Sequence, residues 1–347
     1  MSNQYQREPD FGDGLRLHLN ENTAGCSPRV VEALRTLGPL ALATYPDYRA
    51  VTAACAAHLN VDESQLLLTN GLDEGLLAAA IALLQRERGN EVPEAIIVEP
   101  AFGMYADCVE ATGGRIVTVL PREGFAFPLE ETLTAITPAT RLIFLTSPGN
   151  PTGVVIPNAD VHAVAQAAPG ALVFLDEAYA DFTDTHFIAE IPAAPNVVVG
   201  RTFAKAYGLA ALRIGAVVGH PDAIARLRRS LPPYSINVAA ATALIAALED
   251  RAYVAWYRDQ VRRSRTLIYE MCGRLGLEYW PSEANFVLVR IGPQAGAVVE
   301  ALRARRIFVR DRSSQPGCDG CIRITAGVVA HTEECLAALE EVLCAVR

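Results

Sequence analysis

Lys205 stands in surroundings that would make it chemically reactive. It lies in a turn of small and aromatic residues, 201–208, just after the apolar run 197–199. Burial there would lower the pKa of the amine, and a neutral amine can attack an aldehyde to form a Schiff base. Arg213, eight positions further on, could hold a phosphate through two hydrogen bonds. Taken alone, Lys205 would be an ordinary solvated side chain, because lysine is rarely buried.

Asp176 and Tyr179 supply further groups that fit the same chemistry. A ligand with an aldehyde and a phosphate describes pyridoxal phosphate. Asp176 ends the apolar run 172–175, where an aspartate is costly unless it is paired. A protonated pyridine nitrogen would be a suitable partner and would make the ring an electron sink. Tyr179 could donate a hydrogen bond to the 3′-oxygen of the ring. The alternative is a helix-capping aspartate followed by a packed tyrosine.

Three other segments follow predicted strands and offer polar or flat groups. Asn150 lies in the Pro- and Gly-containing turn 147–153, which would hold its amide rigidly. Residues 70–74 open a predicted helix, whose free N–H groups form an anion site, although Asp73 could simply cap that helix. Phe102 follows another strand and could stack on a flat ring, or it could be plain core.

The order of apolar runs predicts an α/β fold with a mostly parallel, seven-stranded sheet covered on both faces. Each polar cluster above follows a strand, and ligands of such sheets bind beyond the carboxyl ends of the strands. The expected strands are 66–69, 95–99, 116–120, 142–146, 172–176, 197–201 and 214–219, and the expected helices between them include 73–85, 104–112, 160–167 and 222–230.

The pattern changes after about residue 250. A long amphipathic helix, 252–275, is followed by short strands at 285–289, 307–309 and 321–324, a helix at 296–304 and a last helix from 332. This pattern predicts a smaller α+β domain. We expect an N-terminal arm with part of the small domain at 1–45, a large cofactor-binding domain at 46–255 and the small domain at 256–347.

Composition excludes several classes of protein. The formal charge of −9 disfavours a nucleic-acid-binding surface, and no apolar run is long enough to cross a membrane. Residues 1–10 are polar and lack the apolar core of a signal peptide, so we expect a cytoplasmic protein whose eight cysteines are reduced. Cys318 and Cys321 form the one close pair, and without a second pair or nearby histidines we expect no metal site.

Taken together, these motifs resemble those of fold-type I pyridoxal-phosphate-dependent aminotransferases, and more narrowly the histidinol-phosphate aminotransferase family. The Asn-Pro-Thr-Gly segment 150–153, the Asp-Glu-Ala-Tyr segment 176–179 and the spacing of Lys205 and Arg213 are specific for the superfamily. The segments that favour the narrower family are 19–22 and 45–47. Further matches at 71–74, 284–286, 309–310 and 323–325 extend the resemblance over almost the whole chain.

The resemblance implies a role for each matching residue. Lys205 would form the Schiff base and move the proton, Asp176 would pair with the ring nitrogen, Tyr179 and Asn150 would bind the 3′-oxygen, and Phe102 would stack on the ring. The cofactor phosphate would be held by Arg213, Gly71, Leu72, Asp73, Thr202 and the partner subunit's Tyr45. The family is homodimeric, with its active site at the subunit interface.

The implied reaction converts L-histidinol phosphate and 2-oxoglutarate to imidazole acetol phosphate and L-glutamate, a step of histidine biosynthesis. Arg323 would bind the carboxylate of the 2-oxo acid acceptor, and Arg323 with Arg310 would bind the phosphate of the amino donor. Asn22 and Asn150 would also contact the substrate.

Two departures from the family pattern leave alternatives open. Ala204 replaces a serine that bonds the cofactor phosphate, a role that Thr202 or Tyr207 could take over. Ala24 replaces a tyrosine that helps to bind the phosphate of the donor. The alternatives are an aminotransferase of the same family acting on an aromatic or specialised-metabolism amino donor, a pyridoxal-phosphate-dependent amino acid phosphate decarboxylase, and an inactive or regulatory cofactor-binding homologue.

Overall fold

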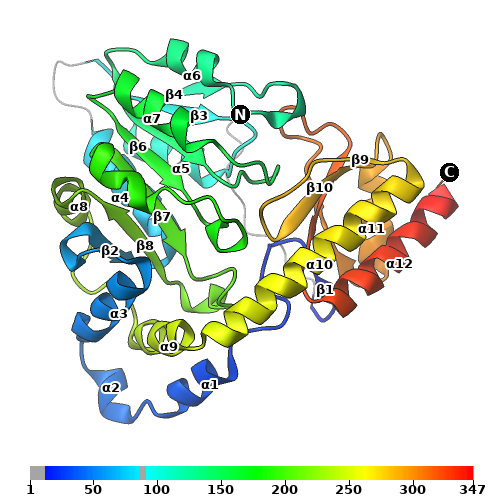
Figure 1. Ribbon diagram of the computed structural model, residues 1–347, viewed down its shortest axis with the longest axis horizontal. Helices are drawn as coiled ribbons and strands as arrows, with labels where there is room; N and C mark the ends of the chain where they lie inside the picture. The colour runs from blue at the N-terminus through cyan, green and yellow to red at the C-terminus, as the bar shows by residue number, and fades with distance from the viewer. Residues whose placement is uncertain (1–11, 86–90, 347) are drawn as a thin grey trace.

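The computed structural model describes residues 12–85 and 91–346. The polar stretch 1–10, on which the expectation of no signal peptide rests, lies outside these residues. The chain forms a large unit around one sheet and a smaller unit beside it, and the long helix α10 (Arg251–Leu275) runs from one to the other (Figure 1). Within the described residues, none of the helices combines the length and the apolar character needed to span a bilayer.

The large unit contains the predicted seven-stranded sheet. Pairing along β4-β3-β5-β6-β7 is parallel, whereas β8 runs antiparallel to both of its neighbours, so the prediction of a mostly parallel sheet is confirmed. The strands lie in the order β2 (Leu66–Thr69), β8 (Gly215–Gly219), β7 (Val197–Thr202), β6 (Leu172–Asp176), β5 (Thr140–Thr146), β3 (Glu94–Val98) and β4 (Arg115–Val119).

Helices cover both faces of this sheet, which explains why its central strands are apolar throughout. One face packs against α4 (Gly71–Leu83), α5 (Met104–Thr112) and α8 (Pro221–Arg228). The other packs against α3 (Arg49–Leu59), α6 (Leu129–Ala135), α7 (Asn158–Ala167) and α9 (Val238–Glu249). Short 3₁₀ turns lie at Glu63–Gln65, Glu123–Phe125, Ala180–Phe182, Ile188–Ala193 and Ala210–Leu212.

The small unit is built on a second, antiparallel sheet in the order β12 (Arg310–Asp311), β13 (Cys321–Thr325), β10 (Phe286–Arg290) and β9 (Glu278–Tyr279). The helices α10 and α11 (Ala295–Ala304) pack on it, and α12 (Val329–Val346) packs against these two helices. The strand β1 (Leu15–Arg16) pairs in parallel with β11 (Ile307–Phe308), which ties the N-terminal segment to this unit. Residues 255 and 256 lie within α10, so the division at that point stays a prediction.

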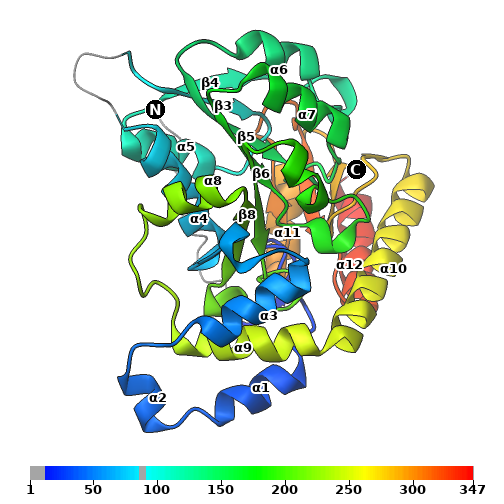
Figure 2. The same ribbon diagram turned by 60° about the vertical axis from the view of Figure 1, so that its left-hand side comes forward.

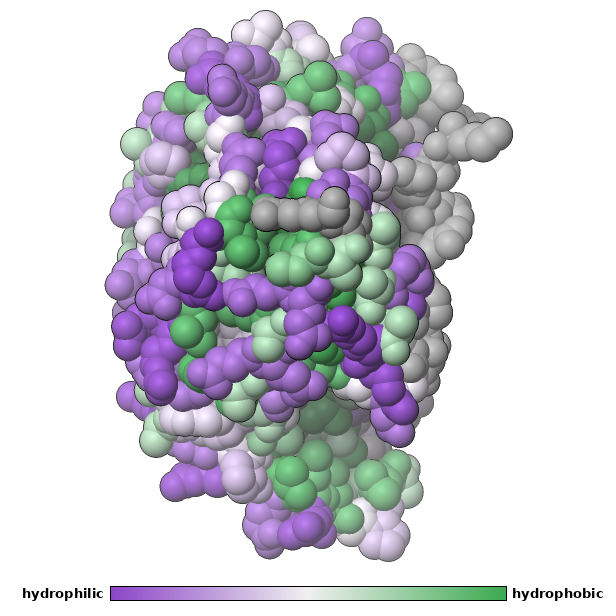
Figure 3. Space-filling model, turned by 90° about the vertical axis from the view of Figure 1, so that its right-hand side faces the viewer, coloured by the Kyte–Doolittle hydropathy of each residue, from purple (hydrophilic) through white to green (hydrophobic). Residues whose placement is uncertain are grey.

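The first two helices, α1 (Pro28–Arg35) and α2 (Pro39–Ala43), project from the body beneath α3 and α9 (Figure 2). Three large apolar side chains on or after α2 face solvent, Leu40 at 76%, Leu42 at 65% and Tyr45 at 79% exposure. Figure 3 shows apolar residues gathered at the end of the molecule that these two helices form. Exposed apolar patches of this kind mark an interaction site.

Candidate active site

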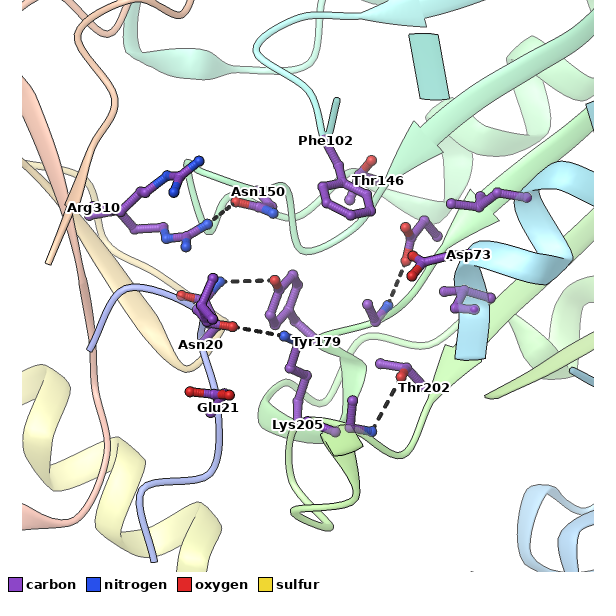
Figure 4. Close-up of a pocket in the computed structure, with 18 of the residues that line it drawn as sticks. Asn20, Glu21, Asp73, Phe102, Thr146, Asn150, Tyr179, Thr202, Lys205 and Arg310 are labelled. Carbon is purple, nitrogen blue, oxygen red and sulfur yellow. Dashed lines mark hydrogen bonds between the residues drawn. The ribbon is translucent and has the colours of Figure 1, made fainter. Parts of the chain in front are cut away.

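A cavity of about 380 Å³ lies where the carboxyl ends of three strands meet the small unit (Figure 4). Thr146, Asp176 and Thr202 come from the ends of β5, β6 and β7, and the register places Thr146 beside Asp176. The opposite wall comes from the segment 18–21 and from arginines of β12 and β13. The parallel topology therefore gathers side chains that are far apart in the sequence, as predicted for such sheets.

Lys205 lies at the floor of this cavity. Its Nζ donates a hydrogen bond to the carbonyl oxygen of Leu19 at 3.0 Å. Burial lowers the pKa of the ammonium group to about 8, and the positive charge of Arg323 adds to the effect. Lys205 is also the single lysine in the chain, so no other side chain can supply an amine. A substantial fraction of this amine is therefore neutral near pH 8, as a nucleophile requires.

Asp176 is held by two hydrogen bonds. The Tyr105 hydroxyl donates to Oδ2 at 2.6 Å, and the Ala178 amide donates to Oδ1 at 2.9 Å. Burial raises the pKa of the carboxyl group to about 6, and the hydrogen bond from Tyr105 opposes that rise. No α-helix begins here, since only the short 3₁₀ turn Ala180–Phe182 follows. The helix-cap alternative therefore does not apply, and the carboxylate remains available to a cationic partner.

Buried ion pairs join the loops that follow β6 and β7. Arg201 lies 3.3 Å from Glu177 and 2.8 Å from Asp181, measured between side-chain nitrogen and oxygen, and all three side chains are largely buried. Glu177 directly follows Asp176, and Arg201 begins the segment that carries Lys205. These pairs fix the two loops relative to each other and so fix the separation of the lysine and the aspartate.

Tyr179 and Asn150 face the cavity from opposite sides. The Asn20 Nδ2 group donates to the Tyr179 hydroxyl at 2.9 Å. Asn150 Oδ1 accepts hydrogen bonds from Arg323 at 2.5 Å and from Arg312 at 3.3 Å. Because two guanidinium groups engage the amide oxygen, the amide NH₂ of Asn150 is the end left to donate into the cavity.

The start of α4 and Arg213 form a polar pocket at the other end of the cavity. Arg213 forms an ion pair with Asp73 at 2.7 Å. Gly71 has a φ of +71°, a left-handed conformation that favours glycine, and a Cβ at this position would displace the Arg213 guanidinium group. The first-turn amides of α4 and the guanidinium group therefore lie together, which is the arrangement that binds phosphate.

Comparison with known proteins identifies the family. The model of the family described as aminotransferase class I and II matches residues 12–342. The chain belongs to this family. The fold, the enzyme class and the resemblance to histidinol-phosphate aminotransferases predicted from the sequence are thereby confirmed.

Relatives of this aminotransferase are similar along most of their length. The histidinol-phosphate aminotransferase of Moorella thermoacetica is 36% identical over 98% of this chain and 88% of its own. That of Symbiobacterium thermophilum is 36% identical over 97% of this chain and 93% of its own. The crystal structure of histidinol-phosphate aminotransferase from Sinorhizobium meliloti in complex with pyridoxal-5′-phosphate superimposes with a TM-score of 0.87 at 29% identity, covering 96% of this chain and 92% of that one.

Most residues predicted for the site of the aminotransferase line one cavity, and three do not: Gly71, Tyr45 and Asn22. Gly71 opens α4 and lies against the Arg213 guanidinium group. Those that line it are Leu72, Asp73, Phe102, Asn150, Asp176, Tyr179, Thr202, Lys205, Arg213, Arg310 and Arg323. Tyr45 is exposed and stacks on Tyr234 at 4.4 Å between ring centroids, outside this cavity. Asn22 is buried, and its Nδ2 donates to the carbonyl of Ala206 at 2.9 Å, so it holds the lysine turn and does not line the cavity.

The structure also distinguishes the two residues expected to compensate for Ala204. Thr202 lines the cavity, and its hydroxyl oxygen accepts a hydrogen bond from the Ala204 amide at 3.2 Å. Tyr207 directs its hydroxyl to His58 Nε2 at 2.9 Å, in a separate groove. Thr202 is therefore the one of the two that remains beside the phosphate pocket.

Several cavity residues were not predicted from the sequence. Asn20 and Glu21 lie inside the family segment 19–22 but carried no chemical signal of their own. Tyr105 has the position of a core residue of its helix, and Arg312 lies in a polar loop. Burial lowers the pKa of His18 to about 4, so this imidazole is neutral in the cavity wall.

Cys318 and Cys321 are both buried and free of disulfides. Burial raises the pKa of these thiols to about 12 and about 11, respectively. No group of three or more metal-ligating side chains occurs among residues 12–85 and 91–346. The pair lies in the apolar cluster around Trp280 and Leu288, where it packs as small hydrophobic residues.

Proposed function

We propose that this aminotransferase binds pyridoxal phosphate and transfers the amino group of L-histidinol phosphate to 2-oxoglutarate. The carrying observation is the placement of the single lysine and a buried aspartate in one cavity, between the phosphate pocket and a group of arginines. The names and 36% identity of the full-length relatives support the choice of donor.

The residues present fit this cofactor. The Gly71 and Arg213 pocket is suited to its phosphate, Asp176 to the ring nitrogen, and Asn150 with Tyr179 to the ring oxygen. Pyridoxal phosphate would supply an aldehyde carbon that takes up the amino group and a ring that withdraws electrons from the neighbouring carbon. The protein supplies orientation, charge and a base, which is the usual division of work in such enzymes.

Lys205 would act as both nucleophile and proton carrier. Its amine, with a pKa lowered to about 8, exists in both protonation states near neutral pH, as a group that takes and returns a proton must. Tyr179 lies with its ring centroid 5.9 Å from the Lys205 Nζ and restricts the space around it. Asp176 would keep a proton at the ring nitrogen, because a buried carboxylate favours a cationic neighbour.

The arginines would recognise the acidic groups of both substrates. Arg310, Arg312 and Arg323 line the cavity, and Figure 4 shows Arg310 on the side opposite Asp73. Arg312 and Arg323 both donate to Asn150. Guanidinium groups bind carboxylate and phosphate through paired hydrogen bonds, which suits an acceptor with two carboxylates and a donor with a phosphate.

An aminotransferase acting on another donor is the second candidate. Ala24 favours it, because the family tyrosine is replaced there and position 24 is exposed outside the cavity. Purified protein should be assayed with 2-oxoglutarate and, in turn, L-histidinol phosphate, L-histidinol and L-phenylalanine. The proposal requires glutamate formation at the highest kcat/KM with L-histidinol phosphate. A higher kcat/KM with phenylalanine would identify a different donor. Carbon dioxide release from an amino acid phosphate such as O-phospho-L-threonine would indicate a decarboxylase.

The proposal includes a homodimer with shared active sites. The exposed apolar residues Leu40, Leu42 and Tyr45 support it, because a second copy would remove them from water. The resemblance then brings the partner subunit's Tyr45 to the cofactor phosphate. A sedimentation mass near 37.2 kDa, the mass of one chain, would contradict this part of the proposal.

The substitution Ala204→Ser should tighten cofactor binding. A serine hydroxyl here would add a hydrogen bond to the phosphate, and such a bond to a charged group contributes about 1.5–3 kcal/mol, or roughly tenfold or more in Kd. The Kd is measured by titrating cofactor-free protein with pyridoxal phosphate. Ala255→Ser, on the exposed face of α10, is the control and should leave the Kd unchanged. An unaltered Kd for Ala204→Ser would mean that Thr202 already satisfies the phosphate.

The rate of cofactor loading should depend on pH through Lys205. Only the neutral amine attacks the aldehyde, so the rate constant should rise about tenfold per pH unit below the pKa and level off above about 8. Stopped-flow absorbance after mixing cofactor-free protein with pyridoxal phosphate measures it. A rate that keeps rising to pH 10 would show an amine with an ordinary pKa.

A further inference from the structure

Tyr105 forms a link between Asp176 and the end of β5. We propose that Tyr105 is a positioning residue in a directed hydrogen-bond chain, Thr146 to Tyr105 to Asp176, which fixes the carboxylate that faces the cofactor ring. The proposal rests on the proposed function, because it concerns the group that Asp176 would bind.

The direction of the two hydrogen bonds follows from the number of protons that each group can donate. The Tyr105 hydroxyl lies 2.6 Å from Asp176 Oδ2 and 2.8 Å from Thr146 Oγ1. An ionised carboxylate only accepts hydrogen bonds, and a phenol has one proton to donate. That proton therefore goes to Asp176, so the Thr146 hydroxyl must donate to Tyr105. Burial and the charge of Asp176 raise the pKa of Tyr105 well above its usual value, which keeps the phenol protonated.

The packing around Tyr105 leaves its ring one orientation. The ring is 1% exposed and stacks on Phe144, with centroids 4.8 Å apart and planes 7° from parallel. Phe102, the residue expected to cover the cofactor ring, meets it edge-on at 5.9 Å. Tyr105 thus contacts both the predicted stacking residue and the predicted partner of the ring nitrogen, and it holds the two in a fixed relation.

The hydrogen bond also sets how strongly Asp176 attracts a proton. Tyr105 occupies one lone pair of Oδ2 and Ala178 one of Oδ1, which lowers the basicity of the carboxylate. The negative charge of Asp73 on α4 raises the basicity of the same carboxylate, whereas the positive charge of Lys205 lowers it. A less basic carboxylate leaves the shared proton on the ring nitrogen, where the positive charge increases the ability of the ring to withdraw electrons.

The test compares Tyr105→Phe, Thr146→Val and the double variant, each loaded with pyridoxal phosphate. A proton on the ring nitrogen lowers the pKa of the lysine-linked nitrogen, so its loss should raise the pH midpoint of the visible absorption band. Tyr105→Phe should raise that midpoint by about half a pH unit or more. It should lower kcat roughly 10- to 100-fold, as expected for a lost hydrogen bond to a charge.

The double variant tests whether Thr146 acts on Asp176 through Tyr105. Thr146→Val should shift the midpoint in the same direction by a smaller amount, and it should add nothing to Tyr105→Phe, because Thr146 acts through the phenol. Tyr269→Phe is the control: that hydroxyl contacts the Ser282 backbone in the small unit, so its loss should leave the midpoint unchanged.

The outcomes distinguish a failure of the Tyr105 proposal from a failure of the proposed function. If the unaltered protein shows no absorption band after loading, the proposed function fails. If the band is present and titrates, but Tyr105→Phe has the original midpoint and kcat, the positioning role is wrong. If Tyr105→Phe does not fold, Thr146→Val provides the test. An unchanged pH midpoint of the absorption band in Thr146→Val would contradict the proposed hydrogen-bond chain.

Discussion

Replacing Lys205 by alanine should abolish transamination, with turnover reduced at least about 10⁴-fold. The substitution removes the nucleophile and the proton carrier together, and general acid–base catalysis alone contributes about 10²–10⁴-fold. Because no other lysine exists in the chain, no neighbouring side chain can substitute. The measurement is glutamate formation from the donor and 2-oxoglutarate at saturating cofactor.

A covalent readout separates this role from a structural one. Borohydride should fix pyridoxal phosphate to the unaltered protein, and peptide mass mapping should locate it at Lys205. Lys205→Arg keeps the positive charge but has no amine of lowered pKa, so it should be as inactive as Lys205→Ala. Turnover near the original level in either variant would contradict the assignment of the whole site.

Replacing Asp176 by asparagine should lower kcat by about 10²–10³-fold while leaving the protein folded. Asparagine has the same shape but no charge, so it cannot hold a proton at the ring nitrogen, and losses of this size follow the removal of one preorganised electrostatic contact. Single-turnover kinetics with excess enzyme measures the chemical step directly.

Asp222 provides the control for this second substitution. It lies in the first turn of α8, its side chain is 96% exposed, and it is not among the cavity residues. Asp222→Asn should keep the original rate. If Asp176→Asn also kept that rate, the ring nitrogen would not need a charged partner, and the account of Asp176 would have to be abandoned.

The sequence was sufficient to predict the parts of the site that follow strands. Continuous apolar runs such as 142–146 and 172–176 define central parallel strands, and the side chains at their carboxyl ends must meet at one edge of the sheet. Asp176 and Lys205 could be placed for this reason. Boundaries were less accurate: α4 begins at Gly71, two residues before the expected start, and α12 begins at Val329, three residues before.

Other parts of the site depend on contacts that no local pattern carries. Tyr105 occupies the position of a core residue in α5, and its hydroxyl reaches Asp176, 71 positions away. Asn20 lies beside Tyr179 because β1 pairs with β11 and brings the N-terminal segment across the cavity. Residues of this kind are recognised only when the tertiary structure places a polar atom of one element against a reactive atom of another.

The most direct test of the central claim is the half-reaction. Cofactor-loaded protein is mixed with L-histidinol phosphate in the absence of an acceptor, and the visible absorption spectrum is recorded before and after 2-oxoglutarate is added. The account predicts that the band of the lysine-bound cofactor disappears with the donor and returns with the acceptor. A spectrum unchanged by the donor would contradict histidinol phosphate as substrate, and a band that is lost and does not return would contradict transamination to 2-oxoglutarate.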